Sequence, residues 1–161
     1  MRRPLVALAA FALCVGSFAA VQAQDRPTTR PGAEAEYPVD ICPVMDVKLD
    51  SKGKPVTRVF DGRTVKVCCA RCVRTFQREA EKYHAKLDAL IVKARLDAYP
   101  LKTCVVGGEE LGGMGEPVNY VHRPTNQLVR FCCAGCVDSF KKTPDQYLAR
   151  IDEAAKAAES N

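Results

Sequence analysis

The pattern of apolar and polar positions predicts a β-hairpin followed by a helix, and it does so twice along the chain. Short strand-like stretches flank a turn at about residues 55–60 with 63–68, and again at 117–122 with 128–132. After the first hairpin, apolar residues recur at spacings of three and four up to about residue 94, which indicates one apolar face of a helix. These residues are Val73, Phe76, Ala80, Tyr83, Leu87, Leu90 and Ile91. Each pattern is therefore expected to fold as a small α+β unit.

The helical region after the second hairpin is predicted to be broken. Thr143-Pro144 has the sequence of an N-cap followed by proline at the first helical position. A short helix should therefore end near Lys142, and a second one should run to about Ala158. The first copy has Ala80 where the second has the proline, which permits one unbroken helix there.

The two patterns are copies of one unit. Cys42 matches Cys104 at an offset of 62 positions, whereas from Val65 onward the offset is 64. The change falls between the predicted strands, where the first copy has Asp61-Gly62 and the second has the longer Arg123–Asn126. An insertion that lies in a turn and leaves every cysteine in register indicates a repeat of one folding unit.

The first residues predict export. Arg2 and Arg3 precede an apolar run from Leu5 to Ala20, and a small-residue triplet ends at Ala23, which is typical of a secretory signal peptide. The run is shorter than the roughly 20 apolar residues that a spanning helix needs. We therefore expect cleavage after Ala23, a periplasmic or secreted location, and no membrane span in the mature chain.

The sequence accordingly divides into a signal peptide (1–23), a polar flexible linker (24–36), a first cysteine-rich unit (37–96) and a second one (97–158). The net charge is +5 at pH 7 with acids and bases interleaved, which together with export argues against nucleic-acid binding. The sequence shows no set of residues typical of a hydrolase active site. The glycine-rich stretch 107–117 lacks the Lys-Ser/Thr ending of a phosphate-binding loop. We therefore expect no enzyme activity.

Eight of the nine cysteines lie outside the signal peptide and fall at matching places in the two units. A unit of this size buries too little apolar surface to be comfortably stable, so a covalent or metal staple is expected. Cysteines three and four residues apart lie on one face of a helical turn, so their sulfurs can reach one ion. A helix N-terminus lowers thiol pKa values, and the resulting thiolates are ligands for a soft or borderline metal ion. The predicted ligands are Cys42, Cys68 and Cys72 in the first unit and Cys104, Cys132 and Cys136 in the second.

The middle cysteines, Cys69 and Cys133, are additional candidate ligands. With them, each unit would hold a tetrahedral Cys₄ zinc site, but neighbours in sequence seldom turn both side chains to one point unless the backbone bends sharply. Without them, three sulfurs would suit copper(I), or zinc with an open position. The expected cofactor is thus one zinc or copper(I) ion per unit.

Three other residues with metal-binding side chains have no equivalent in the other copy. His84 matches Leu148 and His122 matches Phe60, so both histidines are assigned to packing or to the surface. Met45 matches Gly107, and we expect Met45 to pack in the core rather than to act as a thioether ligand.

Two other chemistries compete with metal binding. Exported proteins with even cysteine counts usually form disulfides, although three crowded cysteines per unit would strain such pairing. The Cys-x₂-Cys spacing also occurs in thiol-disulfide oxidoreductases, but no βαβ pattern accompanies it here. The spacing favours metal binding over disulfides and ranks the redox enzyme last.

The second unit, from YPLKTCVVGGEEL to VRFCCAGCVDSFKKTPDQYL, resembles the YHS and TRASH group of small cysteine-rich heavy-metal-binding domains. On that pattern the ligands are the three predicted cysteines of each unit, and the framework of the second unit is Phe131, Phe140, Pro144 and Tyr147. The first unit keeps Phe76 and Tyr83 but has Val67 for the aromatic residue and Ala80 for the proline.

The resemblance implies metal handling or sensing. Together with the cysteine pattern it leads us to expect two tandem zinc-ribbon or treble-clef-like units. The predicted function is an exported, non-catalytic protein that binds zinc, copper or another thiophilic cation, with an envelope metal-transport protein as possible partner. The alternative is a disulfide-stapled secreted interaction module without metal.

Overall fold

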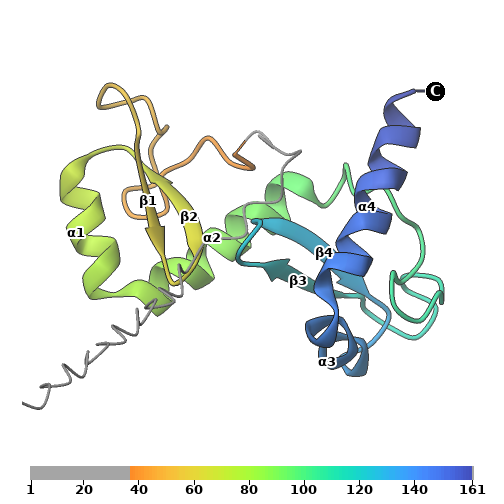
Figure 1. Cartoon of the computed structure of the whole chain (residues 1–161). Coiled ribbons are helices and arrows are strands. Elements are labelled where there is room, and N and C mark those ends of the chain that lie inside the picture. Colours follow the sequence, from red (N-terminus) through yellow and green to blue (C-terminus); the bar gives the residue numbers. More distant parts are fainter. Residues whose placement is uncertain (1–36, 161) are drawn as a thin grey trace, which may run out of the picture.

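The computed structural model describes residues 37–160. The predicted signal peptide (1–23) and linker (24–36) lie outside this range. The described part is a mixed α+β structure with two β-hairpins and four helices, which confirms the predicted class (Figure 1). Within it, no helix has the length and apolar character that a bilayer crossing requires.

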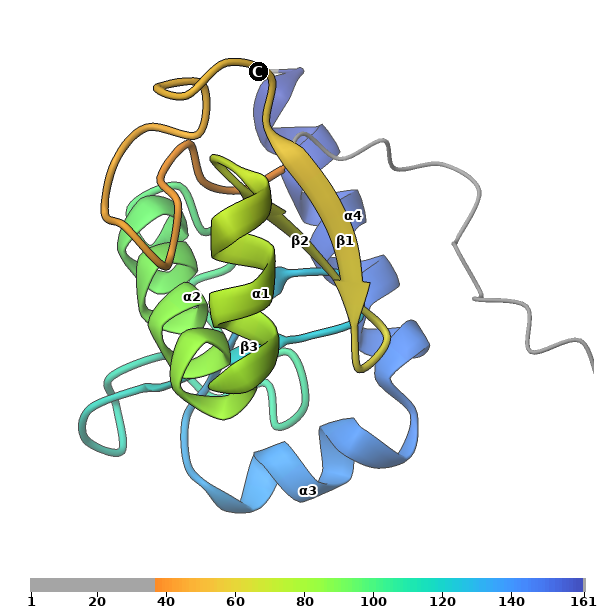
Figure 2. The same cartoon turned by 90° about the vertical axis from the view of Figure 1, so that its left-hand side faces the viewer.

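The first hairpin pairs β1 (Val56–Phe60) with β2 (Arg63–Val67) in antiparallel register, and α1 (Ala70–Arg78) and α2 (Ala80–Arg95) follow it. Figure 2 views α1 in front of this hairpin. The turn at Asp61 has positive φ values at both of its central residues, 48° and 74°, as a two-residue type I′ turn requires. The short turn predicted at this position is confirmed.

The second hairpin pairs β3 (Val118–His122) with β4 (Gln127–Phe131), and α3 (Gly135–Lys142) and α4 (Pro144–Glu159) follow it. Its four-residue turn ends at Asn126, which has φ 56°. The longer turn and the helix break after Lys142 are therefore confirmed.

The first copy is also broken, which corrects the expectation that an unbroken helix could run through Ala80. Glu79 adopts φ −127° and ψ 46° between the two helices, and the equivalent Thr143 adopts φ −143° and ψ 62°. No proline causes the break in the first unit. Instead, the bend lets α1 bury Phe76 while α2 buries its own apolar face against the same core, so tertiary packing decides the backbone conformation.

Each unit has an apolar core beneath its hairpin. In the second, the rings of Phe131 and Phe140 lie 5.5 Å apart, and Tyr147 packs on Phe140 at 6.0 Å. The three aromatic framework residues named by the family resemblance thus form one cluster. Leu148 and Ile151 of α4 complete it.

The two units pack against each other. Helix α2 runs from the first hairpin to the second and contacts β3 and β4 (Figure 1). Side chains alternate across a strand, so β4 turns Val129 and Phe131 into the core of its own unit. Leu128 points the other way and joins Val121 in the core of the first unit. The second hairpin is therefore covered on both faces.

Polar contacts reinforce this interface, and the longer turn supplies them. Asn126 accepts a 2.6 Å hydrogen bond from the fully buried Arg63 and donates one of 2.7 Å to the carbonyl oxygen of Thr64. Arg63 also pairs with Asp88 of α2 at 2.7 Å, and Arg123 approaches the same carboxylate at 3.6 Å. The inserted turn residues thus connect the two units.

Candidate metal centres

The first candidate site, Cys42, Cys68 and Cys72, joins three parts of the first unit. Cys42 lies in the loop before β1, Cys68 directly follows β2, and Cys72 lies in the first turn of α1. All three are buried, and their sulfurs lie within 4.8 Å of one another. The structure therefore brings together the cysteines that the sequence singled out in this unit.

The second candidate site, Cys104, Cys132 and Cys136, has the same arrangement. Its three sulfurs again lie within 4.8 Å of one another. Cys136 is partly exposed, however, whereas the equivalent Cys72 is 2% exposed. Both groups could hold a metal ion, and the second is the more open of the two.

The sulfur spacing can be compared with what an ion needs. In a tetrahedral site with Zn–S bonds of about 2.3 Å, neighbouring sulfurs lie about 3.8 Å apart. The Sγ atoms of Cys68 and Cys72 are separated by 3.6 Å, and those of Cys132 and Cys136 by 3.8 Å. Both distances greatly exceed the 2.05 Å or so of a disulfide bond. These two spacings therefore suit thiolate ligands of one thiophilic cation.

The loop that carries the first cysteine of each site curls around its sulfur. The N–H of Asp46 donates to the carbonyl of Cys42 at 2.9 Å, and that of Gly108 donates to the carbonyl of Cys104 at 2.8 Å. Both donors have positive φ, 56° and 77°. In the second loop this turn also brings the N–H of Gly107 within 3.3 Å of the Cys104 sulfur.

These amides favour a thiolate at the first cysteine of each site. Burial acts to raise the pKa of Cys42, but backbone N–H groups outweigh it and lower that pKa, including those of Cys68 and Met45. The pKa of Cys104 is lowered in the same way, against burial, by the amides of Gly107 and Cys132 among others. Each site therefore contains one sulfur prepared to carry negative charge.

The helical cysteine of each site behaves in the opposite way. Burial, followed by the neighbouring thiols, raises the pKa of Cys136 to about 12, and the same causes raise the pKa of Cys72 strongly. Three crowded sulfurs do not ionise together without a compensating charge, and a bound cation provides one. Binding is therefore expected to release protons.

The middle cysteines stand outside both groups. The sulfur of Cys69 lies 3.6 Å from that of Cys72, and the sulfur of Cys133 lies 3.7 Å from that of Cys136, but neither joins a three-sulfur group. Both are partly exposed. Each contacts the helical cysteine of its site without belonging to the three-sulfur group.

Met45 corrects a prediction, because it does not pack in the core. Its side chain is 45% exposed, and its Sδ lies 4.0 Å from the Sγ of Cys68. The sequence offered a signal for this position: the spacing Cys42-x₂-Met45 places the thioether on the same tight turn as the first cysteine.

The histidines have the packing roles assigned to them. The ring of His84 is fully buried and meets Phe76 edge-on at 5.0 Å, and its Nδ1 lies 3.3 Å from Nη1 of Arg63. His122 packs edge-on against Phe140 at 5.7 Å. Neither histidine belongs to a cysteine group.

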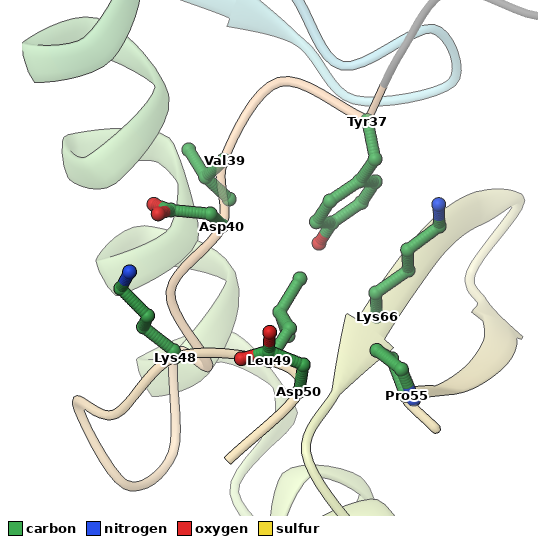
Figure 3. A pocket seen from close by; sticks show the side chains of 8 residues that line it. All are labelled: Tyr37, Val39, Asp40, Lys48, Leu49, Asp50, Pro55 and Lys66. Atoms are coloured by element: carbon green, nitrogen blue, oxygen red, sulfur yellow. The ribbon is translucent and has the colours of Figure 1, made fainter. Parts of the chain in front are cut away.

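A surface pocket of about 330 Å³ lies elsewhere on the first unit (Figure 3). Tyr37, Leu49 and Pro55 line it together with charged residues of both signs, among them Asp50 and Lys66. No cysteine faces it. It offers no set of metal ligands, so the candidate chemistry of the described residues lies in the two cysteine sites.

Comparisons with protein-family models, with curated proteins and with solved structures found no match for this chain. The case for metal binding therefore depends on the cysteine geometry and on the motif resemblance.

Proposed function

We propose that this chain is an exported, non-catalytic metal-binding protein that holds one zinc or copper(I) ion in each cysteine site. The observation that carries the proposal is the pair of three-sulfur groups, one at the matching place in each unit, with spacings suited to metal–thiolate bonds. In this proposal each unit is a zinc-ribbon or treble-clef-like module, in which the ion ties the loop to the helix.

The arrangement suits the handling of ions better than a purely structural role. Structural zinc sites are closed by four protein ligands, whereas each group here has three sulfurs. A three-sulfur site leaves a coordination position at which another molecule can bind the ion and remove it. We therefore propose a role in metal buffering or delivery in the cell envelope, with a metal-transport protein as partner.

Cobalt(II) titration of the reduced full chain tests the binding sites. Cobalt replaces zinc in thiolate sites and gives intense sulfur-to-metal charge-transfer absorption, which should saturate at about two ions per chain, one for each group. Cys42→Ser and Cys104→Ser should each halve that signal. A reduced chain that gives no charge-transfer band with cobalt(II) and also binds no copper(I) would overturn the proposal.

Cell fractionation tests the location. The full chain should accumulate in the envelope or the medium, and deletion of residues 2–23 should retain it in the cytoplasm. Equal distribution of the two forms would remove export from the proposal while leaving metal binding intact.

A further inference from the structure

The two sites differ in one possible sulfur donor, which the repeat itself identifies. Met45 and Gly107 occupy equivalent places, each three residues after the first cysteine of its site. All three cysteines of each site have equivalents in the other. A difference in how the two sites coordinate an ion is therefore expected at this position.

In the first site this position places a fourth sulfur beside one of the cysteines. The Sδ of Met45 lies 4.0 Å from the Sγ of Cys68, close to the roughly 3.8 Å between ligand sulfurs in a tetrahedral site. The side chain remains 45% exposed although it is large and apolar, so burial does not explain its placement. A thioether is a soft donor, and soft sulfur ligands favour copper(I).

In the second site the same position leaves space. A Cβ atom on Gly107 would lie 3.6 Å, 3.7 Å and 3.9 Å from the sulfurs of Cys132, Cys136 and Cys104 respectively. It would thus stand nearly equidistant from all three sulfurs. The backbone does not demand glycine here, because the φ of Gly107 lies outside the left-handed region. The glycine therefore places no side chain of its own over this face of the three sulfurs.

We infer that the Met45 thioether completes the first site as a fourth sulfur ligand, whereas Gly107 keeps a coordination position of the second site free for a sulfur ligand from outside the chain. The first site retains copper(I), and the second exchanges it. This inference rests on the proposed function, and it assigns different tasks to two sites that have the same cysteines.

The exchange needs no redox chemistry. An incoming thiolate adds to the ion at the open position, the protein thiolates leave one after another, and copper stays copper(I) throughout. The partial exposure of Cys136 gives such a ligand access, whereas the equivalent Cys72 is buried. In the first site an incoming ligand must first displace the thioether.

Transfer kinetics test the inference. The reduced full chain is loaded with two equivalents of copper(I), and loss to the chelator bathocuproine disulfonate is followed by absorbance. We expect two phases of one ion each, separated by about tenfold or more in rate, since even a lost outer-shell partner changes metal affinity by about 10–100-fold. Met45→Leu should accelerate the slow phase, and Gly107→Met should slow the fast one. Met114→Leu is the matched control, since Met114 is exposed and lies outside both cysteine groups, and it should change neither phase.

A second measurement does not depend on a substitution in either site. In the Met114→Leu chain labelled with selenomethionine and processed after export, Met45 is the remaining methionine. X-ray absorption at the selenium edge should detect copper at bonding distance after loading. Absence of copper around selenium would overturn the assignment of Met45.

The outcomes separate this inference from the proposed function. A chain that binds two ions but releases them in one phase, with no effect of Met45→Leu, overturns the inference and leaves the metal-binding proposal standing. A chain that binds zinc but no copper(I) also overturns the inference alone. Failure to bind either ion under reducing conditions overturns both.

Discussion

The side-chain oxygen of Asn126 accepts a 2.6 Å hydrogen bond from Nε of Arg63, and this contact joins the turn of the second hairpin to the core of the first unit. Arg63 is fully buried, and its charge is balanced by Asp88. Asn126 belongs to the turn that is longer in the second copy than in the first. The repeat is therefore broken where the two copies meet, and the additional residues hold them together.

Replacement of Asn126 should weaken the whole structure. Asn126→Gly keeps the left-handed backbone at φ 56° but removes both side-chain hydrogen bonds, which leaves a buried guanidinium short of an acceptor. We expect the free energy of unfolding to fall by about 1–3 kcal/mol, measured by urea denaturation. Asn119→Ala, at an exposed position of the same hairpin, should change it by about 0.5 kcal/mol or less. Equal effects of the two substitutions would contradict the role given to Asn126.

The shared core should make unfolding a single event. Leu128 belongs to the second hairpin but is 3% exposed within the core of the first unit. Leu128→Ala should therefore destabilise both units together, by about 2–5 kcal/mol, and leave one cooperative transition in calorimetry. Two separate transitions, of which only one shifts, would mean that the units unfold independently.

The pKa of His84 predicts how stability depends on pH. Burial, followed by the charges of Arg63 and Arg123, lowers the pKa of His84 below its ordinary value. The unfolded chain takes up a proton near pH 6.5, whereas the folded chain does so only at lower pH. The free energy of unfolding should therefore fall as the pH drops below about 6.5.

NMR titration of the two histidine rings is the direct measurement. Burial also lowers the pKa of His122. Both ring signals should therefore titrate below about 6.5, and an apparent pKa for His84 above that value would contradict the account.

Serine scanning should separate the ligands from their neighbours. Cys136→Ser removes a member of the second site and should lower the metal content by one ion, while the first site keeps its own. Cys133→Ser is the matched control, since its sulfur lies 3.7 Å from that of Cys136 but outside the group. Metal analysis after dialysis should find both ions retained in Cys133→Ser. Loss of an ion there would make Cys133 a fourth ligand.

Much of the site could be predicted from sequence because its geometry is mostly local. Cys68 and Cys72 are four residues apart at a helix start, and the repeat confirms which upstream cysteine accompanies them. The placement of Met45 was predicted wrongly because an apolar side chain usually packs in a core. Its location depends on how the loop curls around Cys42, which composition does not report.

The remaining discrepancies are tertiary in origin. No proline or glycine marks the helix break at Glu79 in the sequence. The break depends on the packing of Phe76 beneath the first hairpin. The contact between the units depends on a hydrogen bond between residues 63 positions apart in sequence. The break recurs at the equivalent Thr143, but in the first copy no proline marks it. The contact between the units depends on the turn that differs between the copies, so the repeat carries no signal for it.

The most direct test of metal binding is to measure metal content and free thiols on the full chain, expressed with its N-terminal segment and purified from the cell envelope without chelator. The account predicts about two ions of zinc or copper per chain, one for each cysteine group, and cysteines that react with a thiol reagent only after a chelator is added. A chain with neither metal nor titratable thiols would contradict it, because its cysteines would then be paired as disulfides.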